Sequence, residues 1–560
     1  MDYHNAASGG FWIKDTIILS LLIGCAFFLF LGDRPLGVPD EGNYAEIIRE
    51  MFVSGNFITP YLNEIKFFEK PILLYWLGSL ALKVGGVNVW ALRSINALLA
   101  LLLCLITYLV GRHIYNRQIG WYASLILASN VLFFGLAHFI TTDMTVTVFL
   151  SITLLSFLFF IKKNCSKPWA LYIGAISTGL AMLAKGLIGL FLPGIILCSW
   201  IILTNEWRLL KTIPWIKCIL LFCAIALPWH ILVMRHNPEF FQIYFIEHHF
   251  LRFATRLVGH PQPLWYYLPV ILIGFYPWVI FLPQTLSLIF QNIKHHAPNH
   301  QCDLFLLLWA TIVIGFFTIA TSKLISYILP AFPPLTLLIA RFLNQSHLSK
   351  LKWALGLFIL INIILSSLLL YISNIDHFLN AQKYFIYLSI TLLIGSLISY
   401  IWLKKRQLTF VVFNIAFSTC ISLIIGIVAI PSLDNRSIYS LTMILKKYRS
   451  PQDPVIAFNH FYQDLSFYLQ DRIYILNSHK LLKKGMLHQK HHEWLLNDGN
   501  FNILWQTQPN VFAIMHTNEF QQLPHNYPNL KYVVVAKTRS DVLIKNQETL
   551  LGSVNNSLKK

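Results

Sequence analysis

The sequence predicts an α-helical polytopic membrane protein with about thirteen transmembrane helices and a small C-terminal α/β domain outside the membrane. Two observations support this fold class. Of the 560 residues, 56% are hydrophobic and only 12% are charged, and the mean hydropathy of +0.60 exceeds what one soluble core can bury. In addition, uncharged runs of about 17 to 25 residues recur through the first three quarters of the chain, and each is long enough to cross a hydrocarbon core of about 30 Å.

The apolar runs set the order of the predicted elements. The first span is expected at 16–32, and we expect it to be retained because it lacks an A-x-A-like cleavage site and many spans follow. Together with an external loop at 33–91, the spans form a predicted transmembrane domain over residues 1–432. The twelve later spans are expected at 92–111, 118–136, 144–161, 168–184, 186–203, 216–234, 264–290, 303–320, 325–340, 353–372, 383–402 and 408–430.

Basic residues set the expected orientation, because short cytoplasmic loops are enriched in Lys and Arg. Lys14 precedes the first span, which predicts an inner N-terminus, and an odd number of spans then places the C-terminus outside. The segment 33–92 carries seven acids against five bases and is predicted to be external. The formal net charge of +19 is therefore explained by topology, and no nucleic-acid partner is needed.

The two external regions have predicted structure of their own. In the first loop, apolar residues at helical spacing predict helices near 43–55 and 71–86 that lie along the membrane surface. After 430–437 no segment is apolar for long enough to span, and strands expected at 454–458, 472–476, 511–515 and 531–535 predict an α/β domain over residues 433–560. A basic group in this domain indicates a solvated face, with anionic lipid headgroups as the alternative ligand: Lys483, Lys484, His488, Lys490, His491 and His492.

All eight cysteines lie in or near predicted spans, so neither a disulfide framework nor a CxxC metal site is indicated. The unspaced triplet Glu247, His248 and His249 is a weak candidate for a divalent metal, since solvated or hydrogen-bonded histidines are commoner.

Acidic residues stand at two predicted membrane exits. Asp40 and Glu41 follow the first span, and Asp143 lies between the third and fourth; each has a structural interpretation as a helix cap or first-turn acid. A functional interpretation is favoured by the residues expected at the same face: Glu69, Lys70, Lys185, Arg252, Arg256, Lys323 and Tyr327. Carboxylates beside several cations suit a group transfer that involves phosphate, because cations stabilise an anionic leaving group. No Walker A loop is present, so a lipid-borne phosphate fits better than ATP.

Several stretches also carry a family resemblance. The first loop, PDEGNYAEIIREMFVSGNFITPYLNEIKFFEKPILLYW, resembles that of the GT-C fold glycosyltransferases that use polyprenyl-phosphate sugars. Within the protein O-mannosyltransferase superfamily, the chain is similar to the bacterial 4-amino-4-deoxy-L-arabinose transferases of lipid A. The similarity covers roughly residues 15–340 and continues through TTDMT, LAKGLIGLFLPG, FIEHHFLRF and SKLISYILPAFPPL.

The resemblance implies a polyprenyl-phosphate-linked sugar donor, a lipid A phosphate acceptor, and a bacterial inner-membrane location with the active site and C-terminal domain in the periplasm. It implies that Asp40 is the catalytic carboxylate, that Asp143 is the second acid, and that Lys70 binds the donor phosphate. Glu69 and His248 become candidate contacts for a divalent metal, and no other cofactor is implied. Further contacts with substrate or phosphate are expected from Glu41, Tyr44, Lys185, Arg252, Arg256, Lys323 and Tyr327.

Other functions stay open at this stage. Asn43 stands where the aminoarabinose transferases typically carry Arg, so another amino sugar, and another glycan or a protein as acceptor, remain alternatives. A transporter or flippase of lipid-linked sugars would also place charges among helices, but no internal repeat is evident and the charges are expected at one face. An assembly protein that uses the C-terminal domain would tolerate replacement of Asp40 and Lys70.

Overall fold

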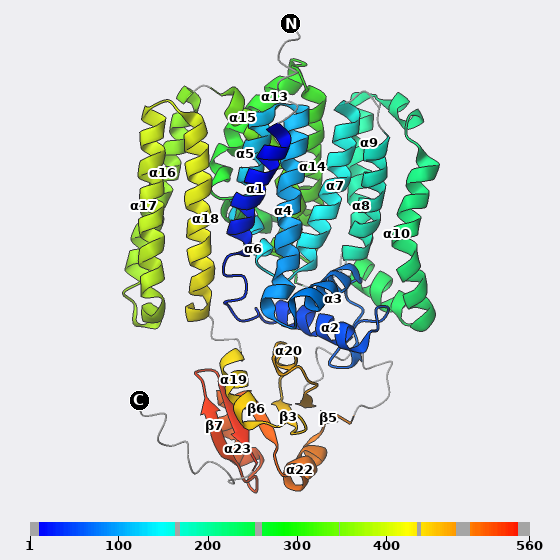
Figure 1. Cartoon of the computed structure of the whole chain (residues 1–560), viewed down its shortest axis with the longest axis vertical. Coiled ribbons are helices and arrows are strands. Elements are labelled where there is room, and N and C mark those ends of the chain that lie inside the picture. The colour runs from blue at the N-terminus through cyan, green and yellow to red at the C-terminus, as the bar shows by residue number, and fades with distance from the viewer. Residues whose placement is uncertain are drawn as a thin grey trace. The chain divides into compact units, whose positions relative to one another are not determined.

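The structure is a computed structural model that describes residues 11–162, 168–251, 260–346, 348–433, 438–477 and 493–546. The chain divides into two compact units (Figure 1). The membrane unit contains residues 1–34 and 69–433, and the C-terminal unit contains residues 35–68 and 434–560. The first predicted external loop is therefore shared between the two units, with residues 35–68 folding together with the C-terminal segment.

The described residues of the membrane unit form helices joined by turns and loops, with an isolated β-bridge between Pro261 and Ser322. Its long helices begin with α1 (Phe11–Phe28), α4 (Val89–Ile114) and α7 (Thr142–Lys162), and α7 packs against both α4 and α8. The other helices are α3 (Leu73–Gly85), α5 (Arg117–Ala128), α6 (Val131–Ala137), α8 (Trp169–Lys185), α9 (Ile188–Thr204), η1 (Trp207–Lys211), α10 (Trp215–His236), η2 (Phe241–Leu251), η3 (Leu264–Tyr266), α12 (Tyr267–Gly274), η4 (Trp278–Phe281), α13 (Leu282–Lys294), α14 (His300–Ile319), η5 (Ile325–Ala331), α15 (Phe332–Gln345), α16 (Leu348–Ile372), η6 (Asp376–Ala381), α17 (Gln382–Lys404) and α18 (Leu408–Leu433).

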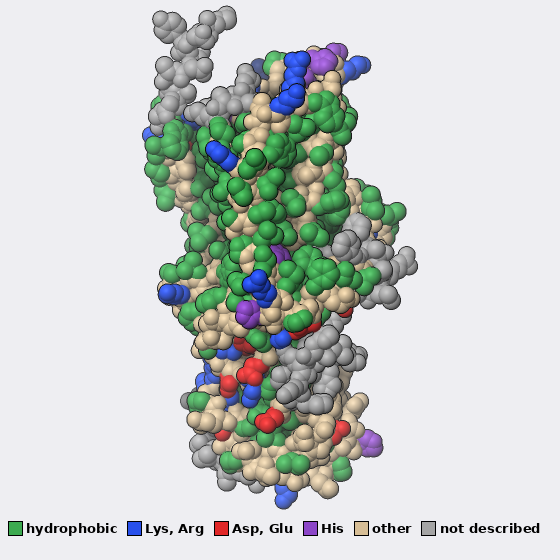
Figure 2. Space-filling view, turned by 90° about the vertical axis from the view of Figure 1, so that its right-hand side faces the viewer, with side chains coloured by type: hydrophobic (Ala, Val, Ile, Leu, Met, Phe, Trp, Pro, Cys, Tyr) green, Lys and Arg blue, Asp and Glu red, His purple; other side chains and the backbone are tan. Residues whose placement is uncertain are grey.

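These helices account for every predicted span. Among the described residues, nine helices are long and apolar enough to cross a membrane, and two further pairs, α5 with α6 and the 264–274 and 278–294 segments, are bent by 69° and 105°. The apolar helices α8 and α9, of 17 residues each, complete the set. Hydrophobic side chains cover the helices on the face shown in Figure 2, as expected for surfaces that contact lipid.

Buried ionic groups tie the helices together. Arg93 on α4 donates to the backbone carbonyls of Leu31 and Arg34, at 3.0 and 2.9 Å, and so holds the segment that follows α1. Arg341 on α15 forms an ion pair with Asp303 on α14, and both side chains are almost fully buried. Charges at such depth are stabilised only by partners of this kind.

The C-terminal unit contains a six-stranded mixed sheet in the order β5-β4-β3-β6-β8-β7. Strands β3 to β6 are parallel, and β8 is antiparallel to both β6 and β7. The elements are α2 (Asp40–Ser54), β1 (Tyr61–Leu62), β2 (Ile65–Lys66), α19 (Tyr439–Tyr448), β3 (Val455–Phe458), α20 (Leu465–Leu469), β4 (Tyr474–Leu476), β5 (Leu495–Leu496), α22 (Asp498–Thr507), β6 (Phe512–His516), α23 (Thr517–Asn526), β7 (Val533–Lys537) and β8 (Asp541–Lys545).

The four predicted strands are confirmed as β3, β4, β6 and β7, whereas β5 and β8 were not predicted. Strand β8 escapes a search for apolar runs because charged residues stand at both of its ends. Asp541 is nonetheless buried, since it accepts a hydrogen bond from Tyr462 Oη at 2.7 Å. The basic group predicted at 483–492 lies outside the described residues.

Both helices predicted in the first loop are present. The first is α2, which starts three residues earlier than predicted, at Asp40, and ends at Gly55, whose φ of 68° lies in the left-handed region. The second is α3. The loop between them contains the β1–β2 hairpin, in which Asn63 and Glu64 occupy left-handed positions.

Candidate active site

Asp143 lies in the first turn of α7 and is buried. Its carboxylate forms an ion pair with Lys185 and accepts a hydrogen bond from the hydroxyl of Ser326. Its backbone N–H donates to Thr141 Oγ1 at 3.1 Å, so Thr141 supplies the cap of this helix. The cap interpretation of Asp143 is therefore wrong, and its side chain forms the buried ion pair instead.

Lys185 stands at the last residue of α8 because two glycines shape the turn that follows. Gly186 has a φ of 79°, which favours glycine, and ends the helix. A Cβ on Gly189 would lie 2.5 Å from the backbone carbon of Ala181, so only glycine lets α9 start this close to α8. The ammonium of Lys185 lies 3.9 Å from the ring centroid of Tyr327, a cation–π contact.

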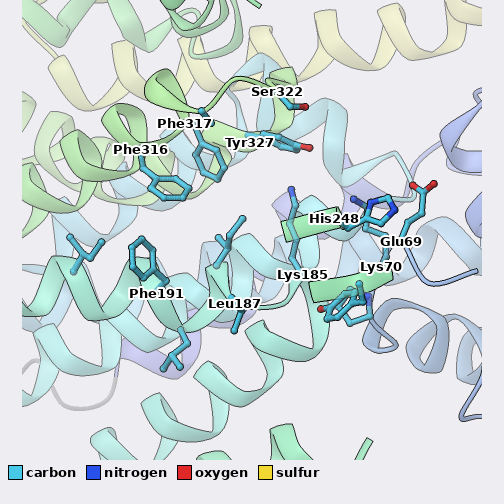
Figure 3. Close-up of a pocket in the computed structure, with 16 residues that line it drawn as sticks. Glu69, Lys70, Lys185, Leu187, Phe191, His248, Phe316, Phe317, Ser322 and Tyr327 are labelled. Carbon is cyan, nitrogen blue, oxygen red and sulfur yellow. The ribbon is translucent and has the colours of Figure 1, made fainter. Parts of the chain in front are cut away.

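A cavity of about 820 Å³ opens beside this ion pair, within the membrane unit. In Figure 3 the charged side chains and His248 lie toward the right of the view, whereas Phe191 and Phe316 lie toward the left. The cavity thus has a polar part and a larger apolar part. Its lining is Glu69, Lys70, Pro71, Lys185, Leu187, Ile188, Leu190, Phe191, Ile195, Tyr244, His248, Phe316, Phe317, Ala320, Ser322 and Tyr327.

The cavity brings together five of the predicted site residues: Glu69, Lys70, Lys185, His248 and Tyr327. They come from the segment before α3, from the end of α8, and from η2 and η5, which are far apart in sequence. Lys70 also lies close enough to Asp143 for their charges to interact. The polar part of the cavity therefore holds two ammonium groups beside a buried carboxylate.

Lys323, another predicted residue of the membrane unit, lies elsewhere. Lys323 is buried and does not line the cavity, because its ammonium donates to the backbone carbonyl of Gln262 at 2.9 Å. Arg252 and Arg256 lie outside the described residues.

Glu69 and His248 supply two possible metal donors in the cavity. Among the residues that the structure describes, no group of three or more His, Cys, Asp or Glu side chains is placed to hold a metal ion. Two protein donors are fewer than the closed set of a resident metal site, so a divalent ion here would need ligands from substrate or water.

Three predicted residues belong to the C-terminal unit: Asp40, Glu41 and Tyr44. Asp40 is exposed and is the first residue of α2, whose cap position is Pro39, so the cap interpretation of Asp40 is wrong as well. Glu41 is buried and accepts a hydrogen bond from the backbone N–H of Gly37 at 2.7 Å, and Tyr44 is buried too.

Some residues of the site were not predicted. Ser326 donates a hydrogen bond to Asp143, and Ser322 lines the cavity. Both serines lie in the SKLISY stretch together with Lys323 and Tyr327, so they could have been predicted as site residues from their position beside these two. The rings of Phe191 and Phe316 carry no such signal, because phenylalanines are frequent in every apolar span.

Comparison with known proteins matches both parts of the chain. Residues 20–244 match the family model described as dolichyl-phosphate-mannose-protein mannosyltransferase, and residues 441–546 match the aminoarabinose transferase C-terminal domain. The undecaprenyl phosphate-alpha-4-amino-4-deoxy-L-arabinose arabinosyl transferase 2 of Proteus mirabilis (strain HI4320) is 32% identical over 330 residues, 58% of this chain and 59% of that protein. The corresponding transferase of Yersinia pestis (strain Pestoides F) is 31% identical over 340 residues, 59% of this chain and 60% of that protein. The matched region thus spans about three fifths of the length of these relatives.

Solved structures extend the likeness to nearly the whole chain. ArnT from Cupriavidus metallidurans bound to undecaprenyl phosphate superposes with a TM-score of 0.86 at 24% identity, over 96% of this chain and 98% of that one. The chain has the GT-C fold. The apo state of the same protein superposes with a TM-score of 0.84. The GT-C fold and the apolar helices make the chain a multi-pass membrane protein, and the predicted resemblance to the aminoarabinose transferases is confirmed.

Proposed function

We propose that this chain is a glycosyltransferase of the bacterial inner membrane. It moves 4-amino-4-deoxy-L-arabinose, or a related amino sugar, from polyprenyl phosphate to a phosphate of lipid A on the periplasmic face. The observation that carries the proposal is the cavity of about 820 Å³ in the membrane unit, with two lysines in its polar part and phenylalanines in its apolar part. A polyprenyl phosphate has the same division into an anionic head and a long apolar tail.

The relatives support the choice of donor. The Proteus and Yersinia proteins are named as transferases that use undecaprenyl phosphate-linked aminoarabinose, and the Cupriavidus structure contains undecaprenyl phosphate. In the same way, we propose that the first span enters the membrane from the cytoplasm, so that the C-terminal domain lies in the periplasm.

The transfer is a single displacement at the anomeric carbon. An acceptor oxygen forms a bond to this carbon while the bond to the donor phosphate breaks, and the electron pair leaves with polyprenyl phosphate, which predicts inversion. Lys70 and Lys185 stabilise the charge that builds up on the leaving phosphate. Asp143 holds the Lys185 ammonium in place through their ion pair.

The carboxylates do not need to act as strong bases in this reaction. A lipid A phosphate is already an anion, so the acceptor oxygen needs little deprotonation. Asp143 and the predicted catalytic carboxylate Asp40 then mainly orient groups and balance charge.

The test is mass spectrometry of lipid A from cells that lack the protein, complemented with wild type, Lys70→Ala or Asp40→Asn at matched levels. Lys83→Ala is the control, because this lysine is exposed on the neighbouring helix α3 and does not line the cavity. We expect a sugar-sized mass increment with wild type and Lys83→Ala, and its loss in the deletion, Lys70→Ala and Asp40→Asn. An unchanged spectrum in the deletion, under conditions where the wild type is demonstrably expressed, would overturn lipid A as acceptor.

A further inference from the structure

The C-terminal unit joins two segments that are distant in sequence. Residues 35–68, which carry α2 and Asp40, form one compact unit with residues 434–560 rather than with the transmembrane helices. The contacts that hold them together join residues about 400 positions apart in sequence. They involve residues before, within and after α2.

Asn63 makes the most specific of these contacts. Its side chain is fully buried, its Nδ2 donates to the carbonyl of Ile473 at 3.1 Å, and its Oδ1 accepts from the N–H of the same residue at 3.1 Å. The amide group thus pairs with the backbone of residue 473 as a neighbouring strand would. A φ of 51° at this position suits asparagine, which tolerates the left-handed region.

Gly42 brings α2 itself against the domain. A Cβ added to Gly42 would lie 2.8 Å from the backbone nitrogen of Asp464 and 2.8 Å from the backbone carbon of Gln463. Backbone atoms cannot turn aside as a side chain does, so any substituent would displace either α2 or the 463–464 segment. Gly42 is two residues after Asp40, and this contact therefore acts directly on the start of the helix that Asp40 begins.

Further bonds flank the helix. Before α2, the N–H of Leu36 donates to Tyr468 Oη at 2.7 Å; within it, Arg49 donates to the carbonyl of Gln470 at 3.4 Å. After α2, Arg472 pairs with Glu64 at 2.8 Å, an exposed pair that adds little. The partners all come from one stretch, 463–473, which contains α20 and its flanking turns.

We infer that residues 463–473 of the C-terminal domain position the loop that carries Asp40, and that Gly42 and Asn63 are the positioning residues. The domain is then a working part of the transferase, and its role is to orient the predicted catalytic carboxylate. This inference rests on the proposed function for the role of Asp40, but the docking of the loop can be measured without it.

The test compares Gly42→Ala and Asn63→Gly in the purified full-length protein; glycine at 63 removes the amide while keeping the left-handed backbone accessible. The matched controls are Gly499→Ala, where a Cβ meets only ordinary contacts among the described residues of the same unit, and Asn56→Ala. Within the part of the chain that the structure describes, the Asn56 side chain accepts hydrogen bonds from Ile58 and Thr59 of its own loop. The readouts are hydrogen exchange of residues 35–68, the Kd of undecaprenyl phosphate, and kcat for sugar transfer.

We expect both test variants to raise exchange in residues 35–68 at least about tenfold and to lower kcat about 10- to 100-fold, as misplaced catalytic groups do. The Kd of undecaprenyl phosphate should stay within about twofold of wild type, because the lining of the lipid cavity lies in the membrane unit. A general folding defect would change all three readouts and would overturn the assignment of a positioning role. Exchange and kcat equal to those of the controls would overturn it as well. If wild type transfers no sugar, the proposed function fails, while the exchange result still decides whether the C-terminal domain holds the loop.

Discussion

Replacement of Lys185 by methionine should have two separable effects. The first is on stability, because Lys185 and Asp143 form a buried pair with side-chain exposures of 9% and 10%. Methionine would leave the Asp143 carboxylate buried with the Ser326 hydroxyl and without its ion-pair partner. Removing one partner of a buried ion pair costs about 3–5 kcal/mol of unfolding free energy.

The second effect is on binding. If the ammonium contacts the donor phosphate, its loss removes a charge-assisted hydrogen bond worth about 1.5–3 kcal/mol, or about 10- to 150-fold in the Kd of undecaprenyl phosphate. Thermal unfolding and lipid binding in nanodiscs measure the two effects. The double variant Lys185→Met/Asp143→Asn should recover most of the stability, because it no longer buries an unpaired charge, but none of the affinity. Wild-type affinity in Lys185→Met would refute the phosphate contact, and a double variant as unstable as the single one would refute the account of the ion pair.

Three further predictions concern other parts of the molecule. Phe191→Asp places a charge in the apolar part of the cavity and should raise the Kd of undecaprenyl phosphate at least about tenfold. The Kd of a short-chain prenyl phosphate, measured in parallel, should change less. In α2, burial and the neighbouring charge of Glu46 raise the pKa of Glu50 well above 4.5. The contribution of Glu50 to the stability of this helix is therefore fully present below about pH 4.5 and is lost as the pH rises through the raised pKa. Hydrogen exchange of residues 40–54, corrected for intrinsic rates, should show this loss in wild type, and Glu50→Gln should flatten it; an equal pH dependence in both would contradict the assignment. Arg341→Met leaves Asp303 buried without its ion-pair partner and should lower the unfolding free energy, measured by thermal unfolding, by about 3–5 kcal/mol. The Kd of undecaprenyl phosphate should stay unchanged, because neither residue lines the cavity. A changed Kd would contradict the view that this ion pair supports only stability.

Local patterns in the sequence were sufficient for most of the secondary structure. Each of the thirteen predicted spans coincides with an apolar helix or a bent helix pair, and nine to eleven of these are long enough to cross a membrane, because such a helix needs an apolar run of sufficient length. The stop at Gly55 and the strands β3, β4, β6 and β7 were likewise predictable from local residue types. Strand β8 was not, because its burial depends on pairing with β6 and β7.

The sequence by itself determined the fold class of this protein and the positions of its apolar helices, and it predicted the residue types of a phosphate-binding site. Only the tertiary structure decided that Asp143 pairs with Lys185 and Ser326, which come from three separate helical segments. It also decided that residues 35–68 fold with the C-terminal domain, against which Gly42 packs. The physical reason is that hydropathy and helix signals depend on neighbours in sequence, whereas ion pairs, cavity walls and close backbone approaches depend on which distant segments pack together.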